Sequence, residues 1–508
     1  MRLAVPALLF VCAIATGAES DVETRRMDHQ RKIAEILEAR RNGNGNPNEH
    51  LDAKVPLESR LQKLRLPSFE ASGRVTLGVS FVDLETSWTI YRHGAERLMT
   101  PASTLKSYTS SCALSTWPAD HRFTTSVRST APVVSGELKG DLVLAGGGDS
   151  MLTVEGLRDL AMRVKTTGLT RVSGDLVVDV SRFGAPPHGP GWMWDDEADY
   201  YNMAVSPLML NFNVVKVAVA EFKGGEPIVT LDPPTALPLE MIPVEGATEV
   251  VIRRIPTTET VRVEFPASGP YAAATARLAV RNPEGWIGQT FRDLLAENGI
   301  AVSGSIRVTR EPVGGTEIAA HQGPPLPETI RHFHKVSENA VGEMLLLEMA
   351  TQQTGEPGTW PAGATYVTEW LTKTARVPAG SFRVVDGSGL SRYNLISGDS
   401  TTALMSHMWR SPLRETFLET LTVYEVDALD PQTGLVIKRP AVRAKTGGMS
   451  SVTTLVGYVE NEGGKTIAFA WLANGYIGDH QWISNVRNKM LATVAASGRD
   501  EPPPLPRE

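Results

Sequence analysis

The chain is poor in the features that support disulfides, metal sites and nucleic-acid binding. It has two cysteines in 508 residues, Cys12 and Cys112, and removal of an N-terminal signal would leave Cys112 alone, without an intrachain partner. The net charge is −7, so no basic excess indicates a nucleic-acid partner. His332 and His334 flank Phe333 without a matched third ligand. We therefore expect no disulfide, no metal, no cofactor and no nucleic acid.

Long apolar runs are also absent, apart from one at the N-terminus. Arg2 is followed by an apolar segment at 3–15 and by the small residues 16–18, which is the pattern of a secretory signal over residues 1–18. The segment is short for a membrane-spanning helix. An uncleaved anchor, with peripheral membrane association, is the alternative. The sequence thus predicts an exported protein of the periplasm or cell envelope.

The composition and the predicted secondary structure change along the chain. Residues 19–56 are polar, end in a Gly/Asn-rich break and form a predicted leader, and residues 498–508 form a loose tail. Many short strands and turns fill residues 120–325. The parts on either side, 57–119 and 326–497, mix longer helices with strands. We predict one domain built from these two parts, interrupted by a β-rich insertion of two nested domains.

The two outer parts predict an α+β domain. Alternation over residues 75–92 predicts an antiparallel hairpin, and residues 442–445, 454–459 and 466–472 predict three further strands. Together they predict a five-stranded antiparallel sheet, with the first and last helices on one face and a helical cluster at 327–430 on the other. In the insertion, residues 138–144 are predicted as one strand and 153–166 as a helix.

Residues 101–106 read Pro-Ala-Ser-Thr-Leu-Lys and begin an apolar segment with helical spacing. Ser103 and Lys106 would lie one turn apart on the same face of that helix. A buried lysine loses its charge more easily, and a neutral amine can take the proton of a neighbouring hydroxyl. Ser103 and Lys106 therefore form a candidate nucleophile and base. The alternative for this motif alone is a helix-capping serine and a solvated lysine.

Two later motifs favour the catalytic interpretation. Ser337-Glu338-Asn339 precedes an apolar helical run, and Lys445-Thr446-Gly447 ends a strand-like run. Ser-x-x-Lys, Ser-Asp-Asn and Lys-Thr-Gly occur together in penicillin-binding proteins and class A β-lactamases. All three are present here in that order, with glutamate in place of the usual aspartate. We expect Ser103, Ser337 and Lys445 to meet at one sheet edge, with the side chain of Glu338 pointing away from the site.

Two glycine-rich segments in the insertion resemble ligand-binding loops. Residues 146–149 (Gly-Gly-Gly-Asp) lack the lysine and hydroxyl residue of a phosphate-binding loop, so a tight turn is predicted. Residues 189–196 carry Trp192, Trp194, Asp195 and Asp196 in a Gly/Pro context. They would either line a ligand cleft or form a loop pinned by buried indoles, and the sequence leaves both interpretations open.

The three motifs, the long insertion and several flanking strings resemble the class C low-molecular-mass penicillin-binding proteins, the D-alanyl-D-alanine carboxypeptidase/endopeptidases. The resemblance covers residues 61–487. The strings that carry it are residues 101–104, 140–144, 146–149, 192–196, 386–392, 394–395 and 444–447. It implies a β-lactamase/transpeptidase-like domain, an antiparallel sheet flanked by helices, with nested β-rich insertion domains.

The resemblance also implies the activity and the role of each site residue. The activity would be cleavage of peptidoglycan stem peptides and crosslinks through an acyl-enzyme, with β-lactam antibiotics as inhibitors. Ser103 would be the nucleophile and Lys106 its base, while Ser337 and Asn339 relay the proton and hold the substrate amide. The remaining residues would bind substrate: Lys445, Thr446 and Gly447 at the terminal carboxylate, Met449 with Ser103 in the oxyanion hole, and Arg392 and Asp196 at the stem side chain.

Two other functions stay open at this point. A β-lactamase would need fast deacylation, yet the chain shows no matching glutamate loop and carries a large insertion. A non-catalytic peptidoglycan-binding module would not need Ser103, Lys106, Ser337 and Lys445, all of which are present. Both are less favoured than the carboxypeptidase/endopeptidase. The motifs leave undecided the oligomeric state and the preference between stem trimming and crosslink cleavage.

Overall fold

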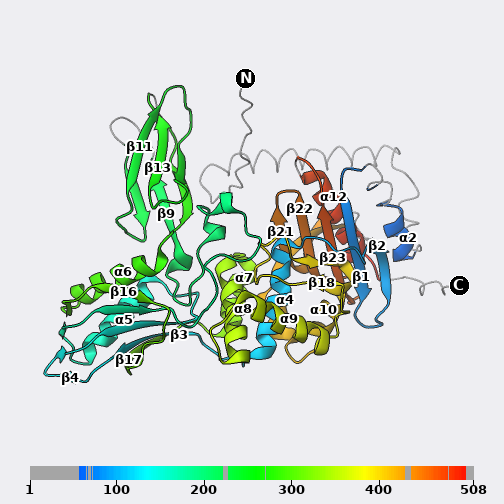
Figure 1. Ribbon diagram of the computed structural model, residues 1–508. Helices are drawn as coiled ribbons and strands as arrows, with labels where there is room; N and C mark the ends of the chain where they lie inside the picture. The colour runs from blue at the N-terminus through cyan, green and yellow to red at the C-terminus, as the bar shows by residue number, and fades with distance from the viewer. Residues whose placement is uncertain are drawn as a thin grey trace. The chain divides into compact units, whose positions relative to one another are not determined.

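A computed structural model of the chain describes residues 56–64, 66, 70, 73–220, 227–268, 270–429, 436–478 and 480–498 (Figure 1). The predicted signal, the predicted leader apart from Pro56 and the predicted tail apart from Gly498 lie outside these residues. Residues 57–499 form one compact unit. Among the described residues, no helix has both the length and the apolar character needed to cross a membrane.

The largest sheet has six strands in the order β2-β1-β23-β22-β21-β20, and every neighbouring pair is antiparallel. The prediction of five strands was therefore one strand short. The extra strand, β20, lies at the sheet edge, where β21 is its neighbour among the described strands, and its sequence lacks the continuous apolar run of the central strands. The strands are β1 (Thr76–Asp83), β2 (Thr89–His93), β20 (Thr422–Leu429), β21 (Val436–Met449), β22 (Val452–Glu460) and β23 (Thr466–Asn474).

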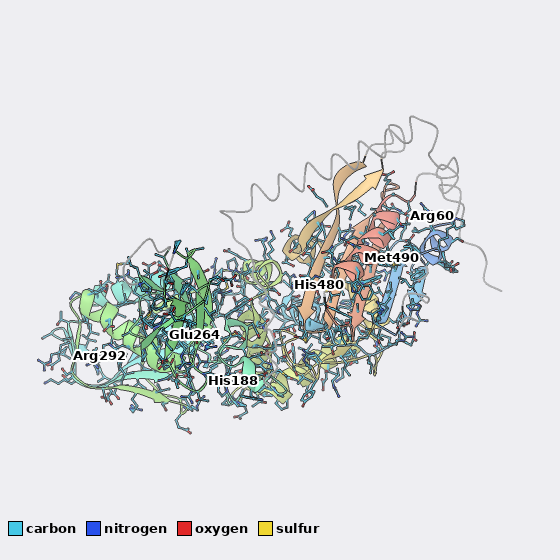
Figure 2. All side chains as sticks on the ribbon, turned by 90° about the horizontal axis from the view of Figure 1, so that it is seen from above. Arg60, His188, Glu264, Arg292, His480 and Met490 are labelled. Atoms are coloured by element: carbon cyan, nitrogen blue, oxygen red, sulfur yellow. The ribbon has the colours of Figure 1, made fainter. Side chains whose placement is uncertain are left out.

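Helices cover both faces of this sheet, as predicted. On one face, the first described helix, α2 (Leu57–Gln62), and the last, α12 (Gln481–Ala495), pack together over a shared apolar cluster; Arg60 and Met490 mark them in Figure 2. The other face carries α4, which follows Ser103, and the later helices. These are α4 (Lys106–Thr116), α7 (Leu326–Lys335), α8 (Asn339–Thr354), α9 (Trp360–Lys373), α10 (Gly398–Arg410) and α11 (Arg414–Thr420), and the short pair β18 (Phe382–Arg383) and β19 (Leu395–Ile396) lies nearby in sequence.

In the described residues between α4 and α7, the insertion has four sheets and two long helices (Figure 1). The mixed five-stranded sheet has the order β16-β8-β6-β3-β17, and the others are β15-β7-β5-β4, β10-β9-β14 and β11-β13-β12. Their bounds are β3 (Thr124–Ser129), β4 (Val133–Val134), β5 (Glu137–Leu138), β6 (Leu142–Gly147), α5 (Val154–Thr166), β7 (Arg171–Val172), β8 (Leu176–Asp179), β9 (Val214–Val219), β10 (Val229–Asp232), β11 (Leu239–Val244), β12 (Val251–Arg254), β13 (Val261–Pro266), β14 (Ala274–Ala279), α6 (Pro283–Glu297), β15 (Ala301–Val302), β16 (Ile306–Thr309) and β17 (Thr316–Gln322).

One prediction in the insertion was wrong and another was confirmed. Residues 138–144 belong to two strands, because the chain bends at Lys139 and Gly140 and the segments on either side enter different sheets. The turn is held by Thr130, whose hydroxyl accepts a hydrogen bond from the Asp141 backbone N–H. The predicted helix at 153–166 is α5, capped by the Thr153 hydroxyl, which accepts from the Gly156 backbone N–H.

Candidate active site

Ser103 and Lys106 lie at the junction between the sheet and α4. Ser103 is in a 3₁₀ turn, Ala102–Leu105, that leads directly into α4 at Lys106. Lys106 Nζ is 2.8 Å from Ser103 Oγ, and it donates to Asn339 Oδ1 at 2.7 Å and to the Ser388 carbonyl at 2.9 Å. The amine is fully buried, whereas Ser103 keeps partial exposure. This geometry suits a hydroxyl that gives its proton to an adjacent amine.

The surroundings of Lys106 favour its neutral form. Burial lowers the pKa of Lys106 to about 8, although the charges of Glu343, Asp386 and Glu338 act in the opposite direction. Near neutral pH, part of the Lys106 population is therefore neutral and able to accept a proton. Burial and the charge of Lys106 also hold the pKa of Lys445 well below its usual range. A substrate carboxylate beside Lys445 would offset that cost and favour its cationic form.

The Ser-Glu-Asn motif reaches this pair from the start of α8. Asn339 is the first residue of α8, and its side-chain amide bridges Lys106 and the Tyr201 carbonyl, to which Nδ2 donates at 2.8 Å. Ser337 has a positive φ of 65° and is partly exposed. Within the described residues its hydroxyl makes no hydrogen bond. The structure thus joins Ser103, Lys106 and Asn339 directly and leaves the Ser337 hydroxyl free.

The Lys-Thr-Gly motif lies on β21, against the turn that carries Ser103. A Cβ atom on Gly447 would lie 2.6 Å from the Pro101 carbonyl oxygen and 2.9 Å from the Thr104 nitrogen, so this close approach requires glycine. Lys445 is buried and donates to the Thr446 carbonyl at 2.8 Å, whereas Thr446 is exposed. Met449 ends the strand. The end of β21 therefore forms one side of the site, as the motif order predicts.

A loop at residues 386–392 closes the opposite side, and two buried carboxylates hold it. Glu343 of α8 accepts the backbone N–H groups of Gly387 at 2.7 Å and Ser388 at 3.0 Å. Asp386 accepts those of Gly389 and Ser391 and the Asn394 side-chain amide. The Ser388 carbonyl is thereby fixed where Lys106 donates to it. Burial raises the pKa of Glu343 to about 8.

The two expected contacts to the stem side chain lie on separate segments. Arg392 is exposed, and its guanidinium reaches the Ser450 carbonyl at 3.3 and 3.4 Å. Asp196 is half-buried, and its carboxylate lies 3.1 Å from the Tyr201 hydroxyl. Burial raises the pKa of Asp196, while the positive charge of Arg392 lowers it.

The tryptophan loop combines features of both interpretations given above. Trp192 Nε1 donates to Asp386 Oδ2 at 3.0 Å, so this indole ties the insertion to the loop at 386–392. Trp194 instead is 85% exposed. One tryptophan therefore pins the loop, and the other is available to solvent or ligand.

Sequence reasoning missed three groups of this site: the Ser388 carbonyl, the carboxylates of Glu343 and Asp386, and Tyr201. The Ser388 and Tyr201 contacts use backbone oxygens and carry no side-chain signature. Glu343 had a usable signal, because it is a charged residue inside the apolar run of α8, and all sides of that helix segment are buried. A carboxylate at such a position has to find buried hydrogen-bond donors.

We predict that Gly389→Ala reduces both stability and acylation. Gly389 has a φ of +88°, and a Cβ there would lie 2.0 Å from the Ala102 carbonyl oxygen, next to Ser103. The backbone must shift, so we expect a loss of about 2 kcal/mol or more in unfolding free energy and slower acylation of Ser103. Denaturant unfolding measures the free energy of unfolding, and the rate of acylation by a β-lactam measures the effect on Ser103. Gly314→Ala, where a Cβ meets nothing within 4 Å, is the control; equal behaviour of the two variants would contradict the prediction.

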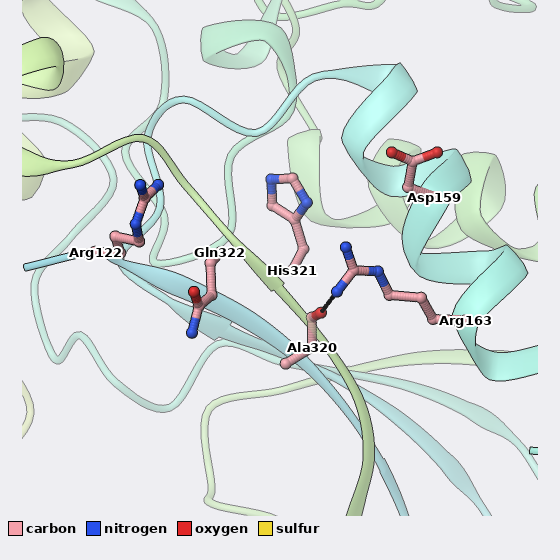
Figure 3. A pocket seen from close by; sticks show the side chains of 6 residues that line it. All are labelled: Arg122, Asp159, Arg163, Ala320, His321 and Gln322. Atoms are coloured by element: carbon pink, nitrogen blue, oxygen red, sulfur yellow. Dashed lines mark hydrogen bonds between the residues drawn. The ribbon is translucent and has the colours of Figure 1, made fainter.

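A separate hollow of about 620 Å³ lies in the insertion, between α5, β17 and Arg122 (Figure 3). Its lining includes Arg163, which donates to the Ala320 carbonyl at 3.1 Å, and His321. None of the predicted catalytic or substrate-binding residues lines it.

Comparison with known proteins adds three findings. Residues 59–497 match the model of a family described as the D-Ala-D-Ala carboxypeptidase 3 (S13) family. The chain is 33% identical over 427 residues to a D-alanyl-D-alanine carboxypeptidase from Actinomadura sp. (strain R39), covering 79% of this chain and 78% of the relative. It is 26% identical to D-alanyl-D-alanine carboxypeptidase DacB from Haemophilus influenzae over 394 residues, 76% of this chain and 82% of that protein.

The fold is similar to that of a solved structure as well. The crystal structure of penicillin-binding protein 4 from Haemophilus influenzae matches with a TM-score of 0.73 at 22% identity, covering 86% of this chain and 99% of the other. The likeness supports the predicted α+β architecture, with the transpeptidase-like domain and its insertion.

Proposed function

The chain belongs to the D-Ala-D-Ala carboxypeptidase 3 (S13) family, and from that premise we propose that it removes terminal D-alanine from peptidoglycan stem peptides and cleaves D-alanyl crosslinks through a serine acyl-enzyme. The observation that carries the proposal is the contact of 2.8 Å between Ser103 Oγ and the buried amine of Lys106. The chemistry would occur in the domain built from residues 57–119 and 326–497. The insertion at 120–325 would shape the substrate groove.

In the first step, Ser103 Oγ attacks the carbonyl carbon of the scissile D-alanyl peptide bond. Its proton passes to neutral Lys106 Nζ, and the carbonyl electrons move onto the oxygen. When the tetrahedral intermediate collapses, the C–N bond breaks and the leaving amine takes a proton, with the Ser337 hydroxyl as the relay from Lys106. An ester on Ser103 remains. Water then attacks this ester while Lys106 accepts its proton. The C–O bond to Ser103 breaks, Lys106 returns the proton to Ser103 Oγ, and the shortened stem is released as a carboxylic acid.

The intermediate's negative oxygen needs fixed donors. We assign these to the backbone N–H groups of Ser103, in the 3₁₀ turn before α4, and of Met449, at the end of β21. Each such donor is worth about 2.7–4 kcal/mol of transition-state stabilisation. The contact of Gly447 with the turn around Ser103 holds the two segments in register. A cation and a hydroxyl, Lys445 and Thr446, would bind the terminal carboxylate of the substrate.

The direct test is to incubate the protein with a stem pentapeptide ending in D-Ala-D-Ala and with a crosslinked stem dimer. Released D-alanine and cleaved dimer, separated by liquid chromatography, are the expected products. Release from neither substrate would refute the proposal. The ratio of the two rates also decides between carboxypeptidase and endopeptidase preference. Because the substrates lie outside the cytoplasmic membrane, the proposal includes export by the N-terminal signal.

We predict that Asp196→Asn discriminates between substrates. A carboxylate at this position suits the free amine of a diamino-acid stem side chain, and loss of the charge should lower kcat/KM for such stems by about tenfold. Acylation by benzylpenicillin, which has no such side chain, should stay within about twofold of the wild-type rate. Parallel kinetics on both compounds check this. Equal losses on both would show that Asp196 supports the fold of the site rather than recognition.

A further inference from the structure

The middle residue of the Ser-Glu-Asn motif makes an ion pair with the insertion. Glu338 Oε2 accepts a hydrogen bond from Arg277 Nη2 at 2.9 Å, and Arg277 lies on β14. The side chain of Glu338 is 1% exposed and that of Arg277 is 39% exposed. The Arg277 guanidinium also stacks on the Tyr200 ring, 4.4 Å from its centroid. Glu338 is thus a buried carboxylate whose cation comes from a different part of the fold.

The insertion binds two successive residues of this motif. Asn339 donates to the Tyr201 carbonyl, and Glu338 is held by Arg277, which packs on the adjacent Tyr200. Ser337 comes immediately before them, with its positive φ. The turn that presents the Ser337 hydroxyl is therefore fixed from the insertion side.

The ion pair also lies within electrostatic reach of the catalytic amine. The negative charge of Glu338 raises the pKa of Lys106. A cation paired with that carboxylate, as Arg277 is, acts in the opposite direction at any distance where the carboxylate acts. The other titratable groups around Lys106 and Glu338 are unchanged in every variant proposed below. Around Lys106 these are Glu343, Asp386, Lys445 and His334, and near Glu338 there is His332 of α7.

We propose that Arg277 is a positioning residue of the insertion, which holds the Ser-Glu-Asn turn and cancels the charge of Glu338 so that Lys106 can act as a base. This inference rests on the proposed function. It assigns the insertion a part in catalysis itself, through a residue that does not touch the substrate. It also explains how the motif can carry a buried acidic residue beside its catalytic lysine.

A double-mutant cycle tests the proposal. The second-order rate constant for acylation by a fluorescent penicillin is measured from pH 5.5 to 10 for the wild type, Arg277→Ala, Glu338→Gln and the double variant. The acid limb of the pH–rate profile is the range in which the rate rises as Lys106 loses its proton. In Arg277→Ala, the uncompensated charge of Glu338 should move this limb to higher pH by at least roughly half a unit. Acylation at neutral pH should become about tenfold slower. Glu338→Gln should move the acid limb to lower pH. The double variant should return it to the wild-type position.

The structure offers a matched control. Arg182 of the insertion pairs with Glu348, a buried glutamate of α8, through two guanidinium nitrogens. Arg182→Ala should lower the melting temperature and leave the acid limb of the pH–rate profile in place, since the carboxylates whose charges raise the pKa of Lys106 are Glu343, Asp386 and Glu338. If Arg277→Ala fails to fold, Glu338→Gln and the double variant decide, because neither leaves an unpaired buried carboxylate. Arg277→Lys, which keeps a cation, should retain most of the rate.

The outcomes separate the inference from the function on which it rests. Opposite shifts in the two single variants, with restoration in the double variant, support the role of Arg277. Limbs that coincide with the wild type, or an Arg277→Ala defect that Glu338→Gln does not correct, overturn it. A wild-type protein that is not acylated at Ser103 at any pH would instead refute the proposed function.

Discussion

Ser103→Ala is expected to abolish release of D-alanine, with a loss of roughly 10⁴-fold or more in kcat, since removal of a nucleophile eliminates the covalent route altogether. Ser103 Oγ is the partly exposed hydroxyl in contact with the Lys106 amine. Alanine removes one atom and leaves the turn intact, so substrate binding should persist. The measurement is steady-state release of D-alanine from a stem pentapeptide, with binding to the variant followed by calorimetry.

The helix that follows Ser103 provides a matched serine for this experiment. Ser107 lies one turn later on α4, and its hydroxyl is buried without a hydrogen-bond partner among the described residues. Ser107→Ala makes the same chemical change and should leave the rate near that of the wild type, with equal or greater stability. If Ser107→Ala were as inactive as Ser103→Ala, the loss would reflect damage to α4. If Ser103→Ala kept its activity, Ser103 would not be the nucleophile.

Lys106→Met is expected to slow acylation by about 10²- to 10⁴-fold, the usual contribution of a general base. Methionine preserves most of the buried volume and removes the amine. In the wild type, only the neutral amine accepts a proton, so the rate should rise with pH and level off above the Lys106 pKa of about 8. Below it, the rate should fall about tenfold per pH unit, because the neutral fraction falls by that factor. The variant should lose this dependence.

A second lysine variant, measured over the same pH range, serves as the control. Lys373→Met removes an exposed lysine of α9 that pairs with Glu369, and it should reproduce both the wild-type rate and the wild-type limb. Melting temperatures for both variants show whether the fold is retained. A Lys106→Met protein that kept the acid limb would assign the titration to another group. The nearest alternative is Glu343, whose pKa burial also raises to about 8.

The order and spacing of three short motifs predicted most of the catalytic geometry. Ser103 and Lys106 lie three residues apart at a helix start, so their contact is a local property of the sequence. The strand pattern also predicted which segments form the central sheet, since β1, β2 and β21–β23 alternate or are apolar in the expected places. The comparisons confirm the family and the fold that these motifs indicated. The catalytic roles of the residues stay predictions until the variants are tested.

Other parts of the site depend on long-range contacts that local patterns do not report. Arg277 is one of many arginines in the insertion, and nothing around it in sequence indicates a partner 61 residues away at Glu338. The side chain of Glu338 was predicted to point away from the site, but nothing in the sequence indicated that it would be buried and paired with Arg277. Edge strand β20 was missed for a similar reason, since only its pairing with β21 defines it.

Intact-protein mass after incubation with benzylpenicillin tests the central claim most directly, with wild type and Ser103→Ala compared side by side. We predict a stable adduct of one penicilloyl group on the wild type and none on the variant, because Ser103 would be acylated by the β-lactam and deacylate slowly. An unmodified wild type with the drug intact would contradict the account and favour a non-catalytic peptidoglycan-binding module. An unmodified wild type with the drug consumed would also contradict it, and would identify a β-lactamase.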